Sequence, residues 1–190
     1  MASDLPLLST PRLVLRPLTL ADAPALFAYA RDPEVSRYTM WDPHRTEADS
    51  EAFLREYVFP RYTEGLPEPY GVTLRDDDRV VGTVGCFAVT RDRRTMELAY
   101  ALARPLWGQG LVVEAARAVL DLVFATFPVE RLQCRCKVEN AASARVMEKL
   151  GLQREGVLRS ALHHRGRDWD MAYYAVLRGE WPGAQANLPG

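Results

Sequence analysis

The sequence has little of what marks a secreted, metal-binding or membrane protein. It has only three cysteines, Cys86, Cys134 and Cys136, without a Cys-x-x-Cys motif, and an odd number makes a poor disulfide framework. The first ten residues lack the basic and apolar regions of a signal peptide. The longest apolar stretch, residues 111–127, is interrupted by charged side chains at three positions, which excludes a membrane span. We therefore expect a cytoplasmic protein without a metal site or a membrane partner.

The sequence also lacks an excess of charge of either sign. Its 24 basic and 25 acidic residues give a formal net charge of −1. Proteins that bind nucleic acids or anionic membranes usually carry a basic surface, so this balance gives no reason to expect either partner. Apolar residues make up 48% of the chain, which at 190 residues suits a single domain with a substantial core.

The hydrophobic patterns predict a mixed α/β fold. Thr19 and Thr46 each stand three residues before an aspartate, a spacing typical of the first turn of a helix. Gly151 follows a short helical pattern and is typical of a residue that ends a helix. The order of elements favours a sheet with helices on both faces. We expect helices near residues 19–31, 48–58, 111–125 and 143–150, and strands near residues 13–17, 70–75, 80–89, 95–103, 131–138, 157–163 and 168–177.

A glycine-rich turn, Trp107-Gly-Gln-Gly110, lies between a predicted strand and a predicted helix. Glycines allow a ligand to approach the backbone closely, and the first N–H groups of a helix point outward, so such a turn suits an anion. A dinucleotide fingerprint would need a third glycine where Val113 stands, and a Walker loop would need a lysine. A turn that uses its glycines only for packing is the alternative.

The strand before this turn has two different faces. One face is expected in the core and carries Met96, Leu98, Tyr100 and Leu102. The other face carries one carboxylate, Glu97, followed by Ala99, Ala101 and Ala103, which leaves it bare enough for a slender ligand. A buried glutamate needs a partner or a chemical role, so Glu97 is either a general base or half of an ion pair with an arginine.

Asn140 and Ser143 open the short helix that follows the next strand. Both are residue types that cap helices, so capping is the simplest explanation for them. They also follow the C-terminal end of a strand, where ligands of α/β sheets tend to bind.

Several short motifs occur in a fixed order along almost the whole chain, from Thr10 to Trp181. They are Tyr70-Gly-Val72, Val81-Gly-Thr-Val-Gly85, Trp107-Gly-Gln-Gly110 with Glu114-Ala115, Asn140 with Ser143, Glu148-Lys-Leu-Gly-Leu152 with Glu155-Gly156, and Asp170 to Tyr174. Together they resemble the GCN5-related N-acetyltransferase superfamily, in particular its ribosomal-protein alanine N-acetyltransferase-like branch. The resemblance implies one domain over residues 1–190, with a core at about 10–181, in which about four helices cover both faces of a mixed sheet of about seven strands.

The resemblance further implies acetyl-CoA as co-substrate, a primary amine as acceptor and no metal, and a homodimer is plausible by the same resemblance. The glycine turn would hold the pyrophosphate, and the pantetheine arm would pair with the strand before it. The residues implied to contact acetyl-CoA are Tyr100, Ala101, Leu102, Trp107, Gly108, Gln109, Gly110, Leu111, Val112, Asn140 and Ser143.

The implied chemistry is direct acetyl transfer. An ammonium cannot attack a thioester, so Glu97 would act as general base and Ser143 as hydrogen-bond donor to the leaving thiolate. An α-amine, with a reference pKa near 8, suits a lone glutamate better than a lysine amine near 10.4, which favours a protein N-terminus. Enzymes of small amines such as antibiotics or polyamines, and a non-catalytic acyl-CoA-binding module, are the alternatives. Tyr38, Met40 and Trp41 are expected on the acceptor side, with ordinary packing as the other explanation.

Two positions depart from the superfamily pattern. Pro105 stands where many members have an arginine or glutamine that contacts phosphate, which leaves the backbone to hold the anion. Met147 stands where many members have a tyrosine that acts as acid, and methionine cannot donate a proton. The second departure is the reason for giving the donor role to Ser143.

Overall fold

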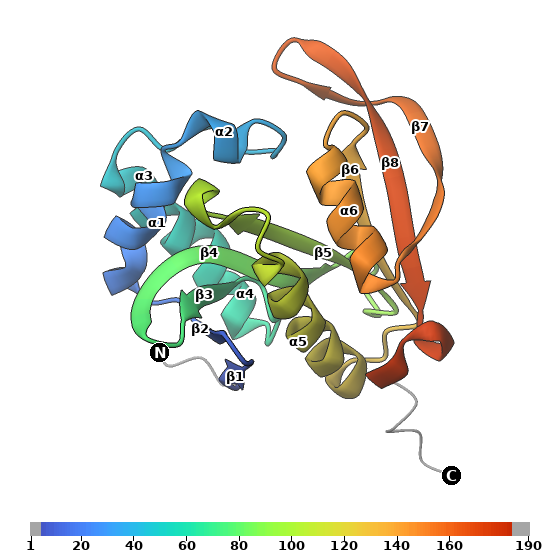
Figure 1. The fold of residues 1–190 in the computed structure, drawn as a ribbon, viewed down its shortest axis with the longest axis horizontal. Coiled ribbons are helices and arrows are strands. Elements are labelled where there is room, and N and C mark those ends of the chain that lie inside the picture. Colours follow the sequence, from blue (N-terminus) through green and yellow to red (C-terminus); the bar gives the residue numbers. More distant parts are fainter. Residues whose placement is uncertain (1–4, 184–190) are drawn as a thin grey trace. The chain divides into compact units, whose positions relative to one another are not determined.

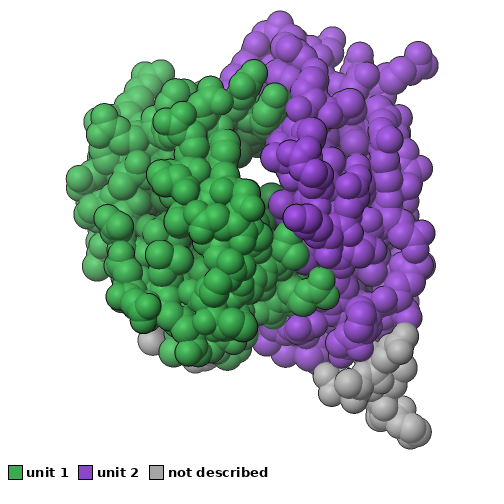
Figure 2. Space-filling model, in the orientation of Figure 1, with its two compact units in different colours: residues 1–87, 99–120 green, residues 88–98, 121–190 purple. Residues whose placement is uncertain are grey.

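The computed structural model describes residues 5–183. Its chain forms two compact units, which are coloured separately in Figure 2. Unit 1 comprises residues up to Phe87 together with Ala99–Leu120, and unit 2 comprises Ala88–Leu98 together with the residues from Asp121 onward. Strand β5 (Thr95–Leu102) and helix α5 (Leu111–Thr126) each contribute residues to both units.

Unit 1 is built on antiparallel strands (Figure 1). β1 (Leu8–Ser9), β2 (Leu13–Pro17), β3 (Tyr70–Leu74) and β4 (Asp77–Ala88) pair in sequence order, and β5 is next in the strand order. The connection from β2 to β3 is helical. It contains the 3-10 turn η1 (Leu20–Asp22), α1 (Ala23–Ala30), α2 (Pro33–Ser36), and a longer helix made of α3 (Glu47–Ala52), the π-helical segment η2 (Phe53–Val58) and α4 (Phe59–Thr63).

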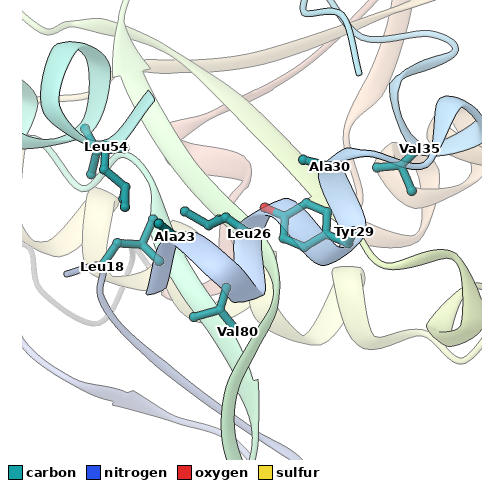
Figure 3. Close-up of a cluster of buried hydrophobic side chains, with 9 residues drawn as sticks. Leu18, Ala23, Leu26, Tyr29, Ala30, Val35, Leu54 and Val80 are labelled. Atoms are coloured by element: carbon teal, nitrogen blue, oxygen red, sulfur yellow. The ribbon is translucent and has the colours of Figure 1, made fainter. Parts of the chain in front are cut away.

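A hydrophobic cluster joins α1 to the long helix and to strand β4 (Figure 3). Leu26 on α1 and Leu54 on η2 are almost fully buried in it. The predicted capping boxes at the starts of these helices are both present, with Asp22 and Asp49 bonded to the backbone of Thr19 and Thr46. The buried members of the cluster are Leu18, Ala23, Leu26, Tyr29, Ala30, Val35, Leu54, Val58 and Val80.

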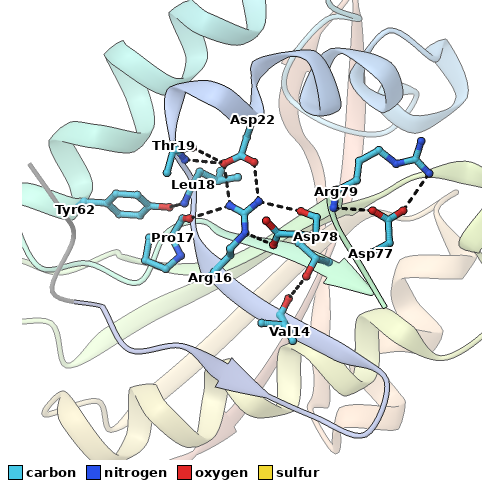
Figure 4. A network of polar contacts seen from close by, with 11 residues as sticks. Val14, Arg16, Pro17, Leu18, Thr19, Asp22, Tyr62, Asp77, Asp78 and Arg79 are labelled. Atoms are coloured by element: carbon cyan, nitrogen blue, oxygen red, sulfur yellow. Dashed lines mark hydrogen bonds and ion pairs between the residues drawn. The ribbon is translucent and has the colours of Figure 1, made fainter. Parts of the chain in front are cut away.

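Arg16 fastens the start of this helical segment to the sheet (Figure 4). Its guanidinium donates to both oxygens of Asp22, at 2.8 and 2.9 Å, and to the side chain and carbonyl of Asp78 near the start of β4. Burial opposes ionisation of Asp22, but the hydrogen bonds from Arg16 and Thr19 outweigh it and lower the pKa of this carboxyl group. Three segments of unit 1 therefore meet at one charged network.

Unit 2 has the strand order β5-β6-β8-β7. The first residues of β5, Thr95–Glu97, pair in parallel with β6 (Arg131–Lys137), and β8 (Arg167–Leu177) is antiparallel to both β6 and β7 (Gln153–His164). Helix α6 (Ala141–Leu150) ends at Gly151, whose φ of 88° confirms the predicted left-handed C-terminal residue. The short 3-10 turn η4 (Arg178–Glu180) follows β8.

The predicted mixed α/β class is confirmed, with differences in number and length. The described residues contain eight strands rather than about seven, because the two-residue β1 carries no periodic signal. Helix α6 begins two residues before the predicted start at Ser143. The loop that contains Tyr38 is preceded by the unpredicted α2, which Asp32 caps by accepting from the backbone N–H of Glu34 at 3.0 Å.

Candidate functional site

The glycine turn connects β5 to α5 in unit 1. After β5 the chain makes the 3-10 turn η3 (Arg104–Leu106), and Trp107–Gly110 then lead into α5. Gly108 and Gly110 have φ values of 78° and 76°, in the left-handed region that side chains disfavour. The indole of Trp107 donates to the carbonyl of Leu102 at 2.7 Å and so fastens the turn to the end of β5. The left-handed backbone conformation therefore explains why glycine occupies both positions.

The outer surface of this turn is open. A Cβ atom at Gly108 would meet nothing within 4 Å, and one at Gly110 would meet only the side chain of Arg12, at 3.8 Å. Residues 107–110 are all exposed, and the amide of Gln109 turns back to the carbonyl of Pro105 at 3.3 Å. Leu111, the first residue of α5, is buried in the core. Exposed backbone at the start of a 16-residue helix fits the predicted anion site.

Glu114, in the first turn of α5, stabilises the glycine turn through Arg12. Its carboxylate accepts from the hydroxyl of Thr10 at 2.6 Å and from the backbone N–H and Nε of Arg12 at 2.9 and 2.7 Å. Arg12 in turn donates to the carbonyl of Gln109 at 3.0 Å. Burial opposes the charge of Glu114, but these donors outweigh it and lower the pKa of the carboxyl group. Sequence reasoning missed this contact, since Arg12 and Glu114 are far apart in the chain.

Glu97 lies on β5 within unit 2 and is buried, with 7% of its surface exposed. Its two oxygens accept from neighbouring side chains on β6: Nε2 of Gln133 at 2.8 Å and Nε of Arg135 at 2.9 Å. The ion pair with an arginine, one of the two explanations that the sequence left open, is therefore present. The bond from Arg135 is charge-assisted, whereas the bond from Gln133 comes from a neutral amide.

The alanine face of β5 is less bare than predicted. Ala99 is exposed, but Ala101 and Ala103 are half-buried and pack against the hydrophobic cluster of unit 1. Leu102 is buried as predicted, whereas Tyr100 is half-buried rather than in the core. The backbone pairing of β5 with β6 ends at Glu97 and Gln133, so the part of β5 after Glu97 lies beyond that register.

Asn140 and Ser143 have the capping contact that their residue types predict. The side-chain oxygen of Asn140 accepts from the backbone N–H of Ser143 at 3.1 Å. The hydroxyl of Ser143 hydrogen-bonds the thiol of Cys136, a buried residue on β6. Burial raises the pKa of that thiol in spite of this bond. Val112, the last of the residues implied to contact acetyl-CoA, is half-buried in the first turn of α5.

Tyr38, Met40 and Trp41 lie in unit 1 and differ in their surroundings. Met40 is 58% exposed. Trp41 packs against the hydrophobic cluster and lies 5.7 Å, between ring centroids, from His44. The guanidinium of Arg37 stands over the ring of Tyr38. Packing therefore accounts for part of this loop, and Met40 is the exposed one of the three residues.

Known proteins are similar to this chain over most of its length. The family model of the acetyltransferase (GNAT) domain matches residues 12–153. The chain belongs to the GNAT acetyltransferase family. The uncharacterized N-acetyltransferase p20 of Bacillus licheniformis is 30% identical over 93% of this chain and 98% of its own length. The family resemblance predicted from the motifs is thus confirmed, and the protein is an enzyme of the acyltransferase class.

Two solved structures have a fold similar to that of this chain. The crystal structure of a GNAT-family acetyltransferase from Bacillus anthracis has a TM-score of 0.81 and 28% identity, and the match covers 90% of this chain and 98% of that chain. RimL, a ribosomal L7/L12 α-N-protein acetyltransferase in complex with coenzyme A, also has a TM-score of 0.81, with the same coverage of 90% and 98%. At 18% identity, RimL shows the fold alone. Within residues 5–183, no helix has the length and apolar character needed to cross a lipid bilayer.

Proposed function

We propose that this GNAT enzyme transfers the acetyl group of acetyl-CoA directly to a primary amine, with Glu97 as general base. The observation that carries the proposal is the buried carboxylate of Glu97, held in place by two donors on a GNAT strand. A buried carboxylate costs free energy unless it has a partner or a chemical role. Glu97 has an ion pair and, in this proposal, a role in the reaction as well. The sequence-based resemblance assigned the same residue.

The glycine turn is the proposed site for the pyrophosphate of acetyl-CoA. Trp107 to Val112 would contact it, mainly through the backbone N–H groups that open α5 and the exposed backbone of Gly108 and Gly110. Pro105 provides no side-chain donor, which agrees with a site made of main-chain atoms. The pantetheine arm would pair with β5 at Tyr100, Ala101 and Leu102, beyond the point at which β6 ceases to pair with that strand. When bound, acetyl-CoA supplies an acetyl thioester.

Glu97 would take the proton of the acceptor ammonium, directly or through a water molecule. Each of its oxygens accepts one hydrogen bond from β6, and a carboxylate oxygen has two acceptor sites, so one site on each oxygen is left for the acceptor. Ser143 would donate to the departing thiolate, with Asn140 fixing the backbone of the same turn. Met147 is fully buried and has no proton to give.

An α-amine is the acceptor that this base favours. Its reference pKa of about 8 is closer to neutrality than the value of about 10.4 for lysine, so less free energy is needed to deprotonate it. The RimL neighbour, by its name, acts on a protein α-amine, which supports a protein N-terminus as the acceptor class. Met40, exposed in the loop after α2, would meet the acceptor together with Tyr38 and Trp41, which are half-buried.

The test compares Glu97→Gln with the wild type. The substitution preserves size but removes the base, so transfer should fall by about 10² to 10⁴, the usual contribution of general acid–base catalysis, while acetyl-CoA still binds. Release of free thiol should be followed with a panel of α-amino peptides, polyamines and aminoglycosides, and binding by calorimetry. Glu130→Gln, at a half-exposed carboxylate of unit 2, is the matched control. Full turnover by Glu97→Gln across the pH range would remove Glu97 from the mechanism, and absence of thiol release with every amine would favour a binding module.

A further inference from the structure

The contacts of Glu97 distinguish a charged partner from a neutral one. Gln133 and Arg135 each give one hydrogen bond to a different oxygen of the carboxylate, at 2.8 and 2.9 Å. They occupy alternate positions of β6 and so share one face of that strand. Only Arg135 brings a positive charge. The side chain of Glu97 is 9% exposed and that of Arg135 is 41% exposed, so the pair is buried at the carboxylate and open at the guanidinium.

Arg135 is itself held in place from the next strand. Its Nη1 donates to the hydroxyl of Tyr173 on β8 at 3.3 Å, and the two residues are direct neighbours in the β6–β8 register. Burial disfavours the charge of Arg135, but the bond to Tyr173 and the charge and hydrogen bond of Glu97 outweigh it and raise the pKa of the guanidinium. The arginine is thus charged and anchored at both ends.

The other charged side chains on this face of β6 contact partners other than Glu97. Arg131, two residues before Gln133, makes a two-point ion pair with Glu155 on β7, at 2.7 and 2.6 Å, and reaches Gln133 only at 3.4 Å. Lys137, two residues after Arg135, lies against His164 at 3.2 Å and over the ring of Trp169. The cation that contacts Glu97 is Arg135.

We propose that Arg135 is a positioning residue for the transfer reaction, which holds the carboxylate of Glu97 in one orientation and aims its oxygens at the acceptor. This inference rests on the proposed role of Glu97 as general base. The guanidinium makes a charge-assisted hydrogen bond to one oxygen, which is stronger than the bond from the neutral amide of Gln133 to the other oxygen. The hydrogen bond to Tyr173 keeps the arginine in this position.

The experiment measures kcat and KM for the best acceptor at saturating acetyl-CoA, together with the affinity for acetyl-CoA by calorimetry. Arg135→Gln should lower kcat by about tenfold or more, because a small misplacement of a catalytic group is costly, while acetyl-CoA binds as it does to the wild type. Arg135→Lys keeps a charged donor and should recover part of this loss, but not all of it, because an ammonium lacks the planar geometry of the guanidinium.

Three further variants separate this role from a merely structural one. Gln133→Leu removes a hydrogen bond from a neutral donor and should lower kcat less than Arg135→Gln does. Tyr173→Phe releases the far end of the arginine and should lower kcat by a smaller amount without weakening acetyl-CoA binding, so it tests the idea even if Arg135→Gln fails to fold. Arg94→Gln, at an exposed arginine 3.9 Å from Glu130, should change nothing.

A kcat that stays at the wild-type value in both Arg135→Gln and Tyr173→Phe would overturn the proposal, as would a loss of acetyl-CoA affinity as large as the loss of kcat. These outcomes are distinct from failure of the general-base assignment. If Glu97→Gln is active, the base is elsewhere. If Glu97→Gln is inactive while Arg135→Gln keeps its kcat, the base stands and only the role of Arg135 is wrong.

Discussion

Replacing Glu114 should show how much the stability of the glycine turn depends on the contacts of this side chain. In the wild type, one oxygen of Glu114 accepts from the hydroxyl of Thr10 and the backbone N–H of Arg12, and the other accepts from the guanidinium of Arg12. The carboxylate side chain is 16% exposed, whereas that of Arg12 is 50% exposed. The bonds to Thr10 and to the backbone are therefore worth more than the ion pair, which water screens.

These contacts set the expected loss in the free energy of unfolding for Glu114→Ala. Hydrogen bonds to a charged group contribute about 1.5 kcal/mol each at the lower end of their range, and a half-exposed ion pair adds less than about 1 kcal/mol. The expected loss is about 3 kcal/mol in the free energy of unfolding, or about 6 to 12 °C in Tm for a chain of this size. Because Arg12 also holds the carbonyl of Gln109, acetyl-CoA should bind about tenfold more weakly.

The assay is thermal unfolding followed by circular dichroism at pH 7.5 and at pH 4, with calorimetry for acetyl-CoA. The pKa of Glu114 is lowered in the folded protein, so its contribution is present above its ordinary value of 4.5 and is lost as the pH falls below it. The gap between mutant and wild type should therefore narrow at acidic pH. Glu34→Ala, which removes an exposed pair at 3.4 Å with Arg37, should cost less than about 0.5 kcal/mol. A Tm within 1 °C of the wild type for Glu114→Ala would refute the reasoning.

Two glycine substitutions test the backbone directly. Gly110→Val places a β-branched residue at a φ of 76°, and should weaken acetyl-CoA binding far more than Gln109→Ala in the same titration; equal effects would mean that side chains make the site. Gly85→Ala would bring a Cβ atom to 2.5 Å from the carbonyl oxygen of Pro67 and should cost about 3 kcal/mol or more in urea unfolding. At Gly156 the same change meets nothing within 4 Å, so a similar loss there would show that strand propensity, not crowding, is responsible.

The sequence predicted the parts of the site that depend on local chemistry. The glycine turn, the helix that starts after it, the cap at Asn140 and the buried carboxylate at Glu97 all follow from residue type and spacing over a few positions. It did not predict that Arg12 reaches Glu114, because that contact joins residues separated by 102 positions and their pairing depends on the tertiary fold. Nor did it predict the half-buried Ala101, since alternation along a strand gives the face of a side chain but not what covers that face.

The two explanations that the sequence offered for Glu97, an ion pair or a general base, are not exclusive in this structure. The ion pair with Arg135 and the hydrogen bond from Gln133 each occupy one acceptor position on a different oxygen of the carboxylate. A carboxylate oxygen has two such positions, so the two donors that hold Glu97 in place leave a second position on each oxygen. In the proposed reaction, that position takes the proton of the acceptor ammonium. The ion pair is therefore compatible with the proposed role of Glu97 as general base rather than an alternative to it.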